Sequence, residues 1–173
     1  AMNRSGRKEE YLELIQRIRQ QIPEAIIRST LLVGFPGETD EDRLVLLDFQ
    51  KMAQIDWLGV FEYSHEEGTT AYNLRAPSRR LVHKASEIRQ EIEQRQTEIC
   101  EERMERFIGQ SMRVLIEEPM HDVELAIGRG YIHAPEVDGN VVVHGEHIEE
   151  GRMYDCTIIK RNGIDLEAVV DER

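Results

Sequence analysis

Residues 26–39 read Ile-Ile-Arg-Ser-Thr-Leu-Leu-Val-Gly-Phe-Pro-Gly-Glu-Thr, and this stretch decides the fold of the first half of the chain. Its apolar part, 26–33, predicts a short strand of a parallel sheet that is buried on both faces. The turn Gly34-Phe35-Pro36-Gly37 ends the strand, because glycine accepts positive φ and proline fixes its own φ. Thr39, with Asp42 three residues later, has the form of a helix start. Strand, glycine turn and helix predict a ligand site at the carboxyl end of the strand.

The segments around this stretch predict an α/β unit. Apolar residues at three- and four-residue spacing predict a helix over 8–21 and a second helix over 41–54 that buries its leucines and methionine (Leu44, Leu47 and Met52). Residues 57–63 predict a second strand, and two strands joined by a helix form a right-handed parallel βαβ unit. A long, charged helix is expected over 78–107. A sheet this small leaves strand edges exposed, and such edges are normally paired or covered.

The hydrophobic period changes after Gly109, where a helix C-cap is expected. Alternating apolar residues and turn residues predict five short strands, at 112–116, 125–132, 140–144, 154–160 and 166–170. Five antiparallel strands of this length predict a small closed barrel of the oligonucleotide-binding kind, because closure removes exposed edges. The fold class is therefore α/β followed by all-β, with domains at 1–109 and 110–173.

Size and cysteine content narrow the class of protein. The chain has 173 residues, enough to bury a core, and no apolar run approaches the roughly 18 residues that span a bilayer. Ala1 is expected to be a remnant of expression, because no signal peptide follows it. Cys100 and Cys156 stand alone, which argues against a disulfide framework or a zinc site. We expect a soluble protein of the reducing cytoplasm.

The charge is strongly acidic and unevenly distributed. The chain has 34 acidic and 22 basic residues, a net of −12; from Gln110 onward 14 acidic face 6 basic residues, a net of −8, which leaves −4 for the longer first part. Nucleic-acid affinity comes largely from Lys and Arg that neutralise phosphates, so this surface disfavours nucleic acid. The pattern favours a basic partner, or a charge that only keeps the protein soluble.

Composition and spacing alone identify no catalytic group. His144 and His147 are the only histidines close together, and a solvated turn near a strand end is a better reading of them than a metal site. No phosphate-binding loop or nucleophile signature is present. The polar loop 64–76 follows a buried strand and is either a substrate contact or a plain connection. Its adjacent carboxylates, Glu66 and Glu67, form an acid pair or are simply hydrated.

Three segments in order resemble the radical S-adenosylmethionine methylthiotransferases. These are Met2-Asn3-Arg4; then 28–39, Arg-Ser-Thr-Leu-Leu-Val-Gly-Phe-Pro-Gly-Glu-Thr; then Gly59-Val-Phe-Glu-Tyr-Ser64 with Glu66-Glu-Gly-Thr69 and Ala71. The tail, Ile127-Gly-Arg-Gly-Tyr131 followed by Ala134-Pro-Glu-Val-Asp-Gly139, is similar to the TRAM domain that ends those enzymes. The likeness covers nearly the whole chain.

Two classes of the family compete for this sequence. The tRNA adenosine (MiaB-like) class usually carries a basic residue in the loop after the second strand. Here His65-Glu66-Glu67-Gly68-Thr69 looks like the RimO-like class, which methylthiolates an aspartate of a small-subunit ribosomal protein. The acidic barrel agrees, because it suits a basic ribosomal protein better than it suits tRNA. A stand-alone, non-catalytic binding module is the third reading.

The resemblance implies a partial (β/α) radical S-adenosylmethionine barrel whose [4Fe–4S] cluster is held by a Cys-x-x-x-Cys-x-x-Cys triplet. This sequence contains no such triplet, and a cluster needs several nearby thiolates. We therefore expect a C-terminal part of a longer enzyme, with no catalytic residue and no metal ligand of its own. The complete enzyme is expected to cleave S-adenosylmethionine reductively to a 5′-deoxyadenosyl radical, abstract a hydrogen and install a methylthio group.

The resemblance also implies roles for particular residues. Arg28 is expected to pair with the carboxylate of the methionyl group, or to form a structural ion pair, since guanidinium matches carboxylates bidentately. The turn residues Gly34, Phe35, Pro36 and Gly37 would let the backbone approach the cofactor, and Phe61 or Tyr63 would flank the adenine. On the substrate side the expected contacts are Glu66, Glu67 and Arg129.

Overall fold

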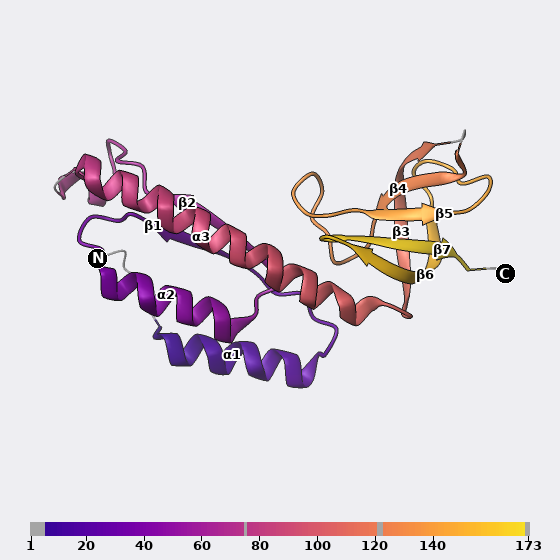
Figure 1. Ribbon diagram of the computed structural model, residues 1–173, viewed down its shortest axis with the longest axis horizontal. Coiled ribbons are helices and arrows are strands. Elements are labelled where there is room, and N and C mark those ends of the chain that lie inside the picture. Colours follow the sequence, from indigo (N-terminus) through magenta and orange to yellow (C-terminus); the bar gives the residue numbers. More distant parts are fainter. Residues whose placement is uncertain (1–5, 75, 121–122, 172–173) are drawn as a thin grey trace. The chain divides into compact units, whose positions relative to one another are not determined.

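The computed structural model describes residues 6–74, 76–120 and 123–171, and the chain divides into two compact units between Ile99 and Cys100. The first unit is built from helices and a small sheet, and the second is built around a barrel (Figure 1). No helix in the described ranges combines the length and the apolar character needed to cross a bilayer. The motif Met2-Asn3-Arg4 lies outside the described residues.

The first unit confirms the predicted βαβ arrangement. Its elements are α1 (Lys8–Gln21), β1 (Arg28–Val33), α2 (Asp40–Ala53), β2 (Trp57–Glu62), the 3-10 turn η1 (Thr70–Asn73) and most of α3 (Arg79–Met104). Strands β1 and β2 are parallel, and their register runs from Arg28 opposite Trp57 to Val33 opposite Glu62. Helix α2 begins as predicted, because the Asp42 amide donates to Thr39 Oγ1 at 3.2 Å and the Thr39 amide donates to Asp42 Oδ2 at 2.9 Å.

The core of this unit lies on one face of the two-stranded sheet. Buried residues of β1, α2, β2 and α3 form it, namely Val33, Leu47, Val60, Ala85, Ile88 and Ile92. On the opposite face Arg28 and Thr30 are exposed, and Phe61 is 60% exposed. The expectation of a strand buried on both faces is therefore wrong for β1, because among the described residues only one face is covered by helices.

Helix α2 is rotated relative to the predicted buried face. Leu44 and Met52 are 65% and 58% exposed, whereas the buried positions are Leu47, Gln50 and Ala53. The Nε2 of the buried Gln50 donates to the Ile92 carbonyl at 2.9 Å, so this nitrogen has a partner inside the core. A polar residue on the buried face hid the true periodicity from a purely apolar pattern.

The second unit confirms the predicted closed barrel of five strands. The strands are β3 (Ser111–Met120), β4 (Leu125–Arg129), β5 (Val141–His144), β6 (Met153–Asn162) and β7 (Asp165–Val170), in the closed order β3-β4-β5-β7-β6. The expectation that all pairs are antiparallel is wrong at one position, because β5 and β7 are parallel, with Val141 opposite Leu166. An odd number of strands cannot alternate in direction around a closed ring, so one parallel pair is unavoidable.

The compact barrel unit begins before the predicted domain start at residue 110. The end of α3 and the 3-10 turn η2 (Glu105–Phe107) belong to it. Phe107 is only 2% exposed, and its ring centroid lies 6.5 Å from that of Tyr131. Arg161 of β6 joins the same segment through Nη1 to Glu101 at 3.1 Å and Nη2 to Glu105 at 3.2 Å.

Candidate functional site

The turn after β1 is shaped by two glycines with different neighbours. Gly34 has φ +80°, and a Cβ built on it would lie 2.6 Å from the Ala85 Cβ of α3. Gly37 has φ +95°, and nothing lies within 4 Å of its Cβ position. Gly34 therefore permits close packing of the turn on α3, while Gly37 leaves one side of the turn open to another molecule.

Glu38 holds this turn from inside. Its Oε2 accepts hydrogen bonds from the amides of Gly34 and Phe35, the latter at 3.0 Å, and its own amide donates to the Phe35 carbonyl at 3.0 Å. Burial raises the pKa of the Glu38 carboxyl, although the two amides act to lower it. The Gly34 and Phe35 amides are thus satisfied within the chain, so the open part of the predicted backbone site is Gly37.

Aromatic side chains meet beyond the ends of the two strands. The Phe35 and Tyr63 rings pack edge to face with centroids 5.1 Å apart, and the Tyr63 hydroxyl lies 3.2 Å from His65 Nδ1. His65 in turn stacks on Tyr72 with centroids 4.7 Å apart. This strand-end cluster, Phe35, Tyr63, His65 and Tyr72, joins two predicted cofactor residues to the loop that follows β2.

Phe61 belongs to a different surface. It lines an open groove of about 710 Å³ beside β1, which we call the strand-edge groove. The groove is walled by β1 residues 29–32, by α2 and by α1, and its apolar contacts include Val45 and Phe49. Its volume lies in the range of small-molecule sites, and its apolar and aromatic lining is typical of them.

Arg28 is not brought to the turn. It lies at the first residue of β1, six residues before Gly34, which at about 3.3 Å per residue places the two backbones roughly 20 Å apart. The structure therefore places together Phe35, Pro36, Gly37 and Tyr63, sets Phe61 in the strand-edge groove, and leaves Arg28 at the opposite end of β1. The role of Arg28 toward a methionyl carboxylate stays a prediction.

The loop after β2 is held by its own short contacts. Ser64 Oγ donates to the Glu66 carboxylate, Thr69 Oγ1 donates to the Glu66 carbonyl at 2.9 Å, and the Tyr72 amide donates to Thr69 Oγ1 at 3.2 Å. Glu66 and Glu67 are both exposed. The loop therefore presents two carboxylates to solvent from a backbone that is fixed at the strand-end cluster.

Arg129 lies in the second unit, at the end of β4. Its Nε donates to Glu117 Oε1 at 2.6 Å, so its guanidinium is engaged in an ion pair across β3 and β4. The flanking glycines are explained by packing, since a Cβ on Gly128 would strike the Leu115 carbonyl and a Cβ on Gly130 would strike Met112 Sδ. The Gly-Arg-Gly motif thus builds the barrel, and substrate contact by Arg129 stays a prediction.

The described residues do not fit an iron–sulfur cluster. Cys100 and Cys156 are both buried free thiols, and burial raises the pKa of Cys156 to about 11, which disfavours the thiolate that ligates iron. No three potential ligands among His, Cys, Asp and Glu gather around one point in the described part of the chain. His144 Nε2 instead lies 3.3 Å from Glu167 Oε2 on the barrel surface.

Three site residues escaped the sequence reasoning. Glu38 looked like an ordinary acidic helix start, yet its position four residues after Gly34 places its carboxylate under the turn. His65 entered the sequence analysis only as part of the loop motif, and Tyr72 did not enter it, because their stacking depends on how the loop folds back. A residue that supports a turn from within cannot be told from an exposed one by composition.

Comparison with known proteins finds similar sequences over nearly the whole chain. Residues 108–170 match the TRAM domain. A protein of Treponema denticola named ribosomal protein uS12 methylthiotransferase RimO is 41% identical over 189 residues, which cover 98% of this chain and 40% of that protein. Proteins of the same name from Shewanella sp. (41% over 174 residues, 98% and 35% covered) and Koribacter versatilis (37% over 174 residues, 96% and 34% covered) are also similar. The chain therefore spans two fifths or less of the length of these relatives.

Proposed function

We propose that this chain, which belongs to the RimO-like family of methylthiotransferases and carries its TRAM domain, is the C-terminal part of an enzyme that adds a methylthio group to an aspartate of a small-subunit ribosomal protein. The observation that carries the proposal is the identity of 37–41% over 96–98% of the chain, because it runs through both compact units. The TRAM match alone covers only the barrel and leaves the first unit unassigned.

The radical chemistry lies outside this chain in the proposal. Its two cysteines are buried and do not fit a [4Fe–4S] cluster, so we expect the isolated chain to be inactive. A cluster held elsewhere in the complete enzyme would supply the electron for the cleavage of S-adenosylmethionine. The chain itself contributes binding surfaces that position cofactor and substrate and exclude water, which is how a protein serves cofactor chemistry.

The strand-edge groove and the adjoining strand ends form the cofactor wall in this proposal. Phe61 offers an exposed aromatic ring in an apolar groove of about 710 Å³, which suits the flat face of a purine. Gly37 leaves the turn open to a polar ligand, while Phe35 and Tyr63 form a second aromatic surface at the same edge of the sheet. We expect Phe61→Ala to weaken cofactor binding more than Tyr63→Phe does.

The protein substrate meets acidic surfaces in the proposal. Glu66 and Glu67 project from the loop after β2, and the chain from Gln110 onward has a net charge of −8. Complementary charge favours encounter with a basic protein and disfavours the phosphates of tRNA. Modification of a ribosomal protein also places the enzyme in the cytoplasm.

The test uses the complete enzyme with its cluster-bearing part and its cluster reconstituted without oxygen. Incubated with ribosomal protein uS12, S-adenosylmethionine, a one-electron reductant and a sulfide source, it is expected to replace one hydrogen atom of an aspartate by a methylthio group. Peptide mass spectrometry detects the gain in mass, which is that of the methylthio group less the hydrogen, and locates it. Charge reversal at Glu66 and Glu67 is expected to raise KM for the protein. Methylthiolation of tRNA adenosine with uS12 unchanged would overturn the proposal in favour of the tRNA class.

The same preparation separates the enzyme from a binding module. High-affinity partner binding by the chain, together with a complete protein that shows no methylthio transfer to either substrate, would support a non-catalytic module.

A further inference from the structure

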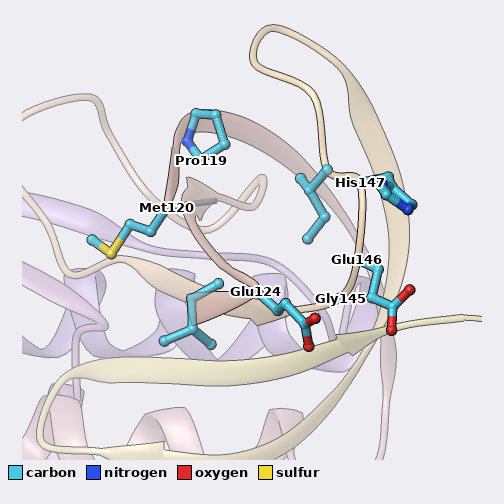
Figure 2. A pocket seen from close by; sticks show the side chains of 8 residues that line it. Pro119, Met120, Glu124, Gly145, Glu146 and His147 are labelled. Atoms are coloured by element: carbon cyan, nitrogen blue, oxygen red, sulfur yellow. The ribbon is translucent and has the colours of Figure 1, made fainter. Parts of the chain in front are cut away.

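A small hollow lies at one end of the barrel, outside the surfaces described above. It has a volume of about 170 Å³ and is formed where β3 ends, β4 begins and the chain leaves β5 (Figure 2). Its lining is apolar at Met120, Leu125 and Ile148. Glu124, Glu146 and His147 also line it, and all three are exposed at its rim. A cavity of about 150 Å³ accepts a group the size of a benzene ring, so this barrel-end hollow accepts one side chain.

The backbone holds the two glutamates next to each other. The Gly145 amide donates to the Glu124 carbonyl at 3.1 Å, which fixes the segment after β5 against the segment before β4. Ile148 is only 4% exposed and anchors the same segment to the barrel. In Figure 2 the Glu124 and Glu146 side chains extend to the same side, away from Pro119 and Met120. The carboxylates are therefore placed by the fold.

Several carboxylates of the barrel are neutralised by a basic neighbour. Glu117 pairs with Arg129, Glu149 with Arg152, and Glu167 with Lys160. Within the described residues, Glu124 and Glu146 have no such basic partner. An apolar wall that ends in two uncompensated carboxylates matches a long aliphatic stem that ends in a cation.

We infer that the barrel-end hollow receives an arginine or lysine side chain of the basic protein substrate. The inference rests on the proposed function, and it adds a defined contact to the general attraction between an acidic barrel and a basic protein. The stem packs against Met120, Leu125 and Ile148, and the cationic head lies between Glu124 and Glu146. The two carboxylates disfavour a phosphate backbone at this hollow.

The first test probes the hollow without a protein substrate. The ¹⁵N-labelled chain is titrated with N-acetyl-arginine methylamide, and with the citrulline analogue, which has nearly the same shape and no charge. We expect saturable shifts of the Leu125, Gly145 and Ile148 amide signals with the arginine compound and much weaker binding of the citrulline compound. Equal binding of both compounds, or shifts confined to other parts of the barrel, would overturn the inference.

Substitutions test whether the charges of Glu124 and Glu146 bind the arginine compound. Removing both charges with Glu124→Gln and Glu146→Gln is expected to weaken the arginine compound about tenfold, at roughly threefold per exposed ion pair. Glu136→Gln is the control for each single variant, because it removes one carboxylate charge and Glu136 is exposed in the loop between β4 and β5, at the other end of β4 from the hollow. A double variant that binds as tightly as the Glu136→Gln control contradicts the inference.

The second test uses the complete enzyme. The double variant is expected to raise KM for the ribosomal protein severalfold and to leave kcat unchanged, because the hollow binds and does not react. An unchanged KM would show that the substrate does not use the hollow. If the complete enzyme instead modifies no ribosomal protein, the proposed function fails, while the titration still decides whether the hollow accepts a basic side chain.

Discussion

At Gly34 the absence of one methyl group lets the turn after β1 lie against α3. We expect Gly34→Ala to destabilise the protein by at least about 2 kcal/mol, because it combines strain at positive φ with a clash against Ala85. Gly37→Ala is the control, since it has the same backbone strain and open space, and it is expected to cost only about 1 kcal/mol. Unfolding in urea measures the free energy of unfolding of both variants.

A double variant separates the clash from the strain. Ala85→Gly removes the atom that the new methyl group would strike. The Gly34→Ala substitution should therefore cost less free energy of unfolding in the Ala85→Gly background than in the unchanged protein. No recovery would mean that the backbone conformation at Gly34, and not its contact with α3, accounts for the effect.

Glu38 should give the unfolding free energy a specific dependence on pH. Burial raises the pKa of Glu38 in the folded chain above its ordinary value of 4.5. Its contribution is therefore fully present below the unfolded pKa and is lost as pH rises through the folded pKa. We expect Glu38→Gln, which still offers a carbonyl to the two amides, to remove this decline when unfolding is compared across mildly acidic pH.

Removal of the acceptor has a separate effect. Glu38→Ala leaves the Gly34 and Phe35 amides without their partner and is expected to cost about 1–3 kcal/mol at every pH. If Glu38→Ala proved as stable as Glu38→Gln, solvent would be satisfying the amides.

Sequence reasoning at this scale succeeded where the cause is local. The Thr39 cap was predictable because a hydroxyl and a carboxylate three residues apart form a helix start whatever surrounds them. Glu38 was not predictable, because its role depends on a turn that folds over it. Glu38 and Thr39 are neighbours in sequence, but Glu38 is held by the turn before it and Thr39 by the helix after it.

At the scale of elements, the strand-end cluster should order the loop after β2. His65→Ala removes both the stacking on Tyr72 and the contact with the Tyr63 hydroxyl. We expect faster amide hydrogen exchange over residues 66–73 and unchanged exchange in α2, because the loop would open locally. Tyr63→Phe, which keeps the ring against Phe35, is expected to show a smaller increase. Equal protection in all three proteins would exclude an ordering role.

The junction between α3 and the barrel gives a second prediction for elements. Residues 100–173 should form a more stable barrel than residues 110–173, because the shorter version lacks Phe107 and the partners of Arg161. Arg161→Ala should reduce the difference in stability between the two versions. Thermal unfolding measures this difference. Equal stability of the two versions would favour the boundary expected from the change in periodicity at Gly109.

The hydrophobic pattern predicted the positions of the barrel strands but not their directions. Alternation located all five barrel strands to within a few residues, because each strand has one buried and one exposed face. It gave no strand directions, and an all-antiparallel barrel was expected. Counting the strands corrects this without further data, since five cannot alternate around a ring. Only the open edge at β1 could be predicted, and not the groove itself, since the residues that line the groove come from four separate elements.

At the scale of the whole molecule, uneven charge predicts how activity responds to salt. With a net of −8 from Gln110 onward and −4 before it, the chain should attract a basic protein most strongly at low ionic strength. We expect KM of the complete enzyme for the ribosomal protein to rise with added potassium chloride while kcat changes little. A KM that is independent of salt would remove the electrostatic argument for a basic partner.

The position of β7 between β5 and β6 bears on how the protein is made. The strand that completes the ring is the last of the five in chain order, so during translation the four earlier strands leave the ribosome with β5 and β6 still lacking a neighbour. Such edges recruit other chains. A premature stop codon anywhere before Asp165 should therefore yield an aggregating product rather than a slightly shortened barrel, and a nascent barrel would need shielding until its final strand emerges.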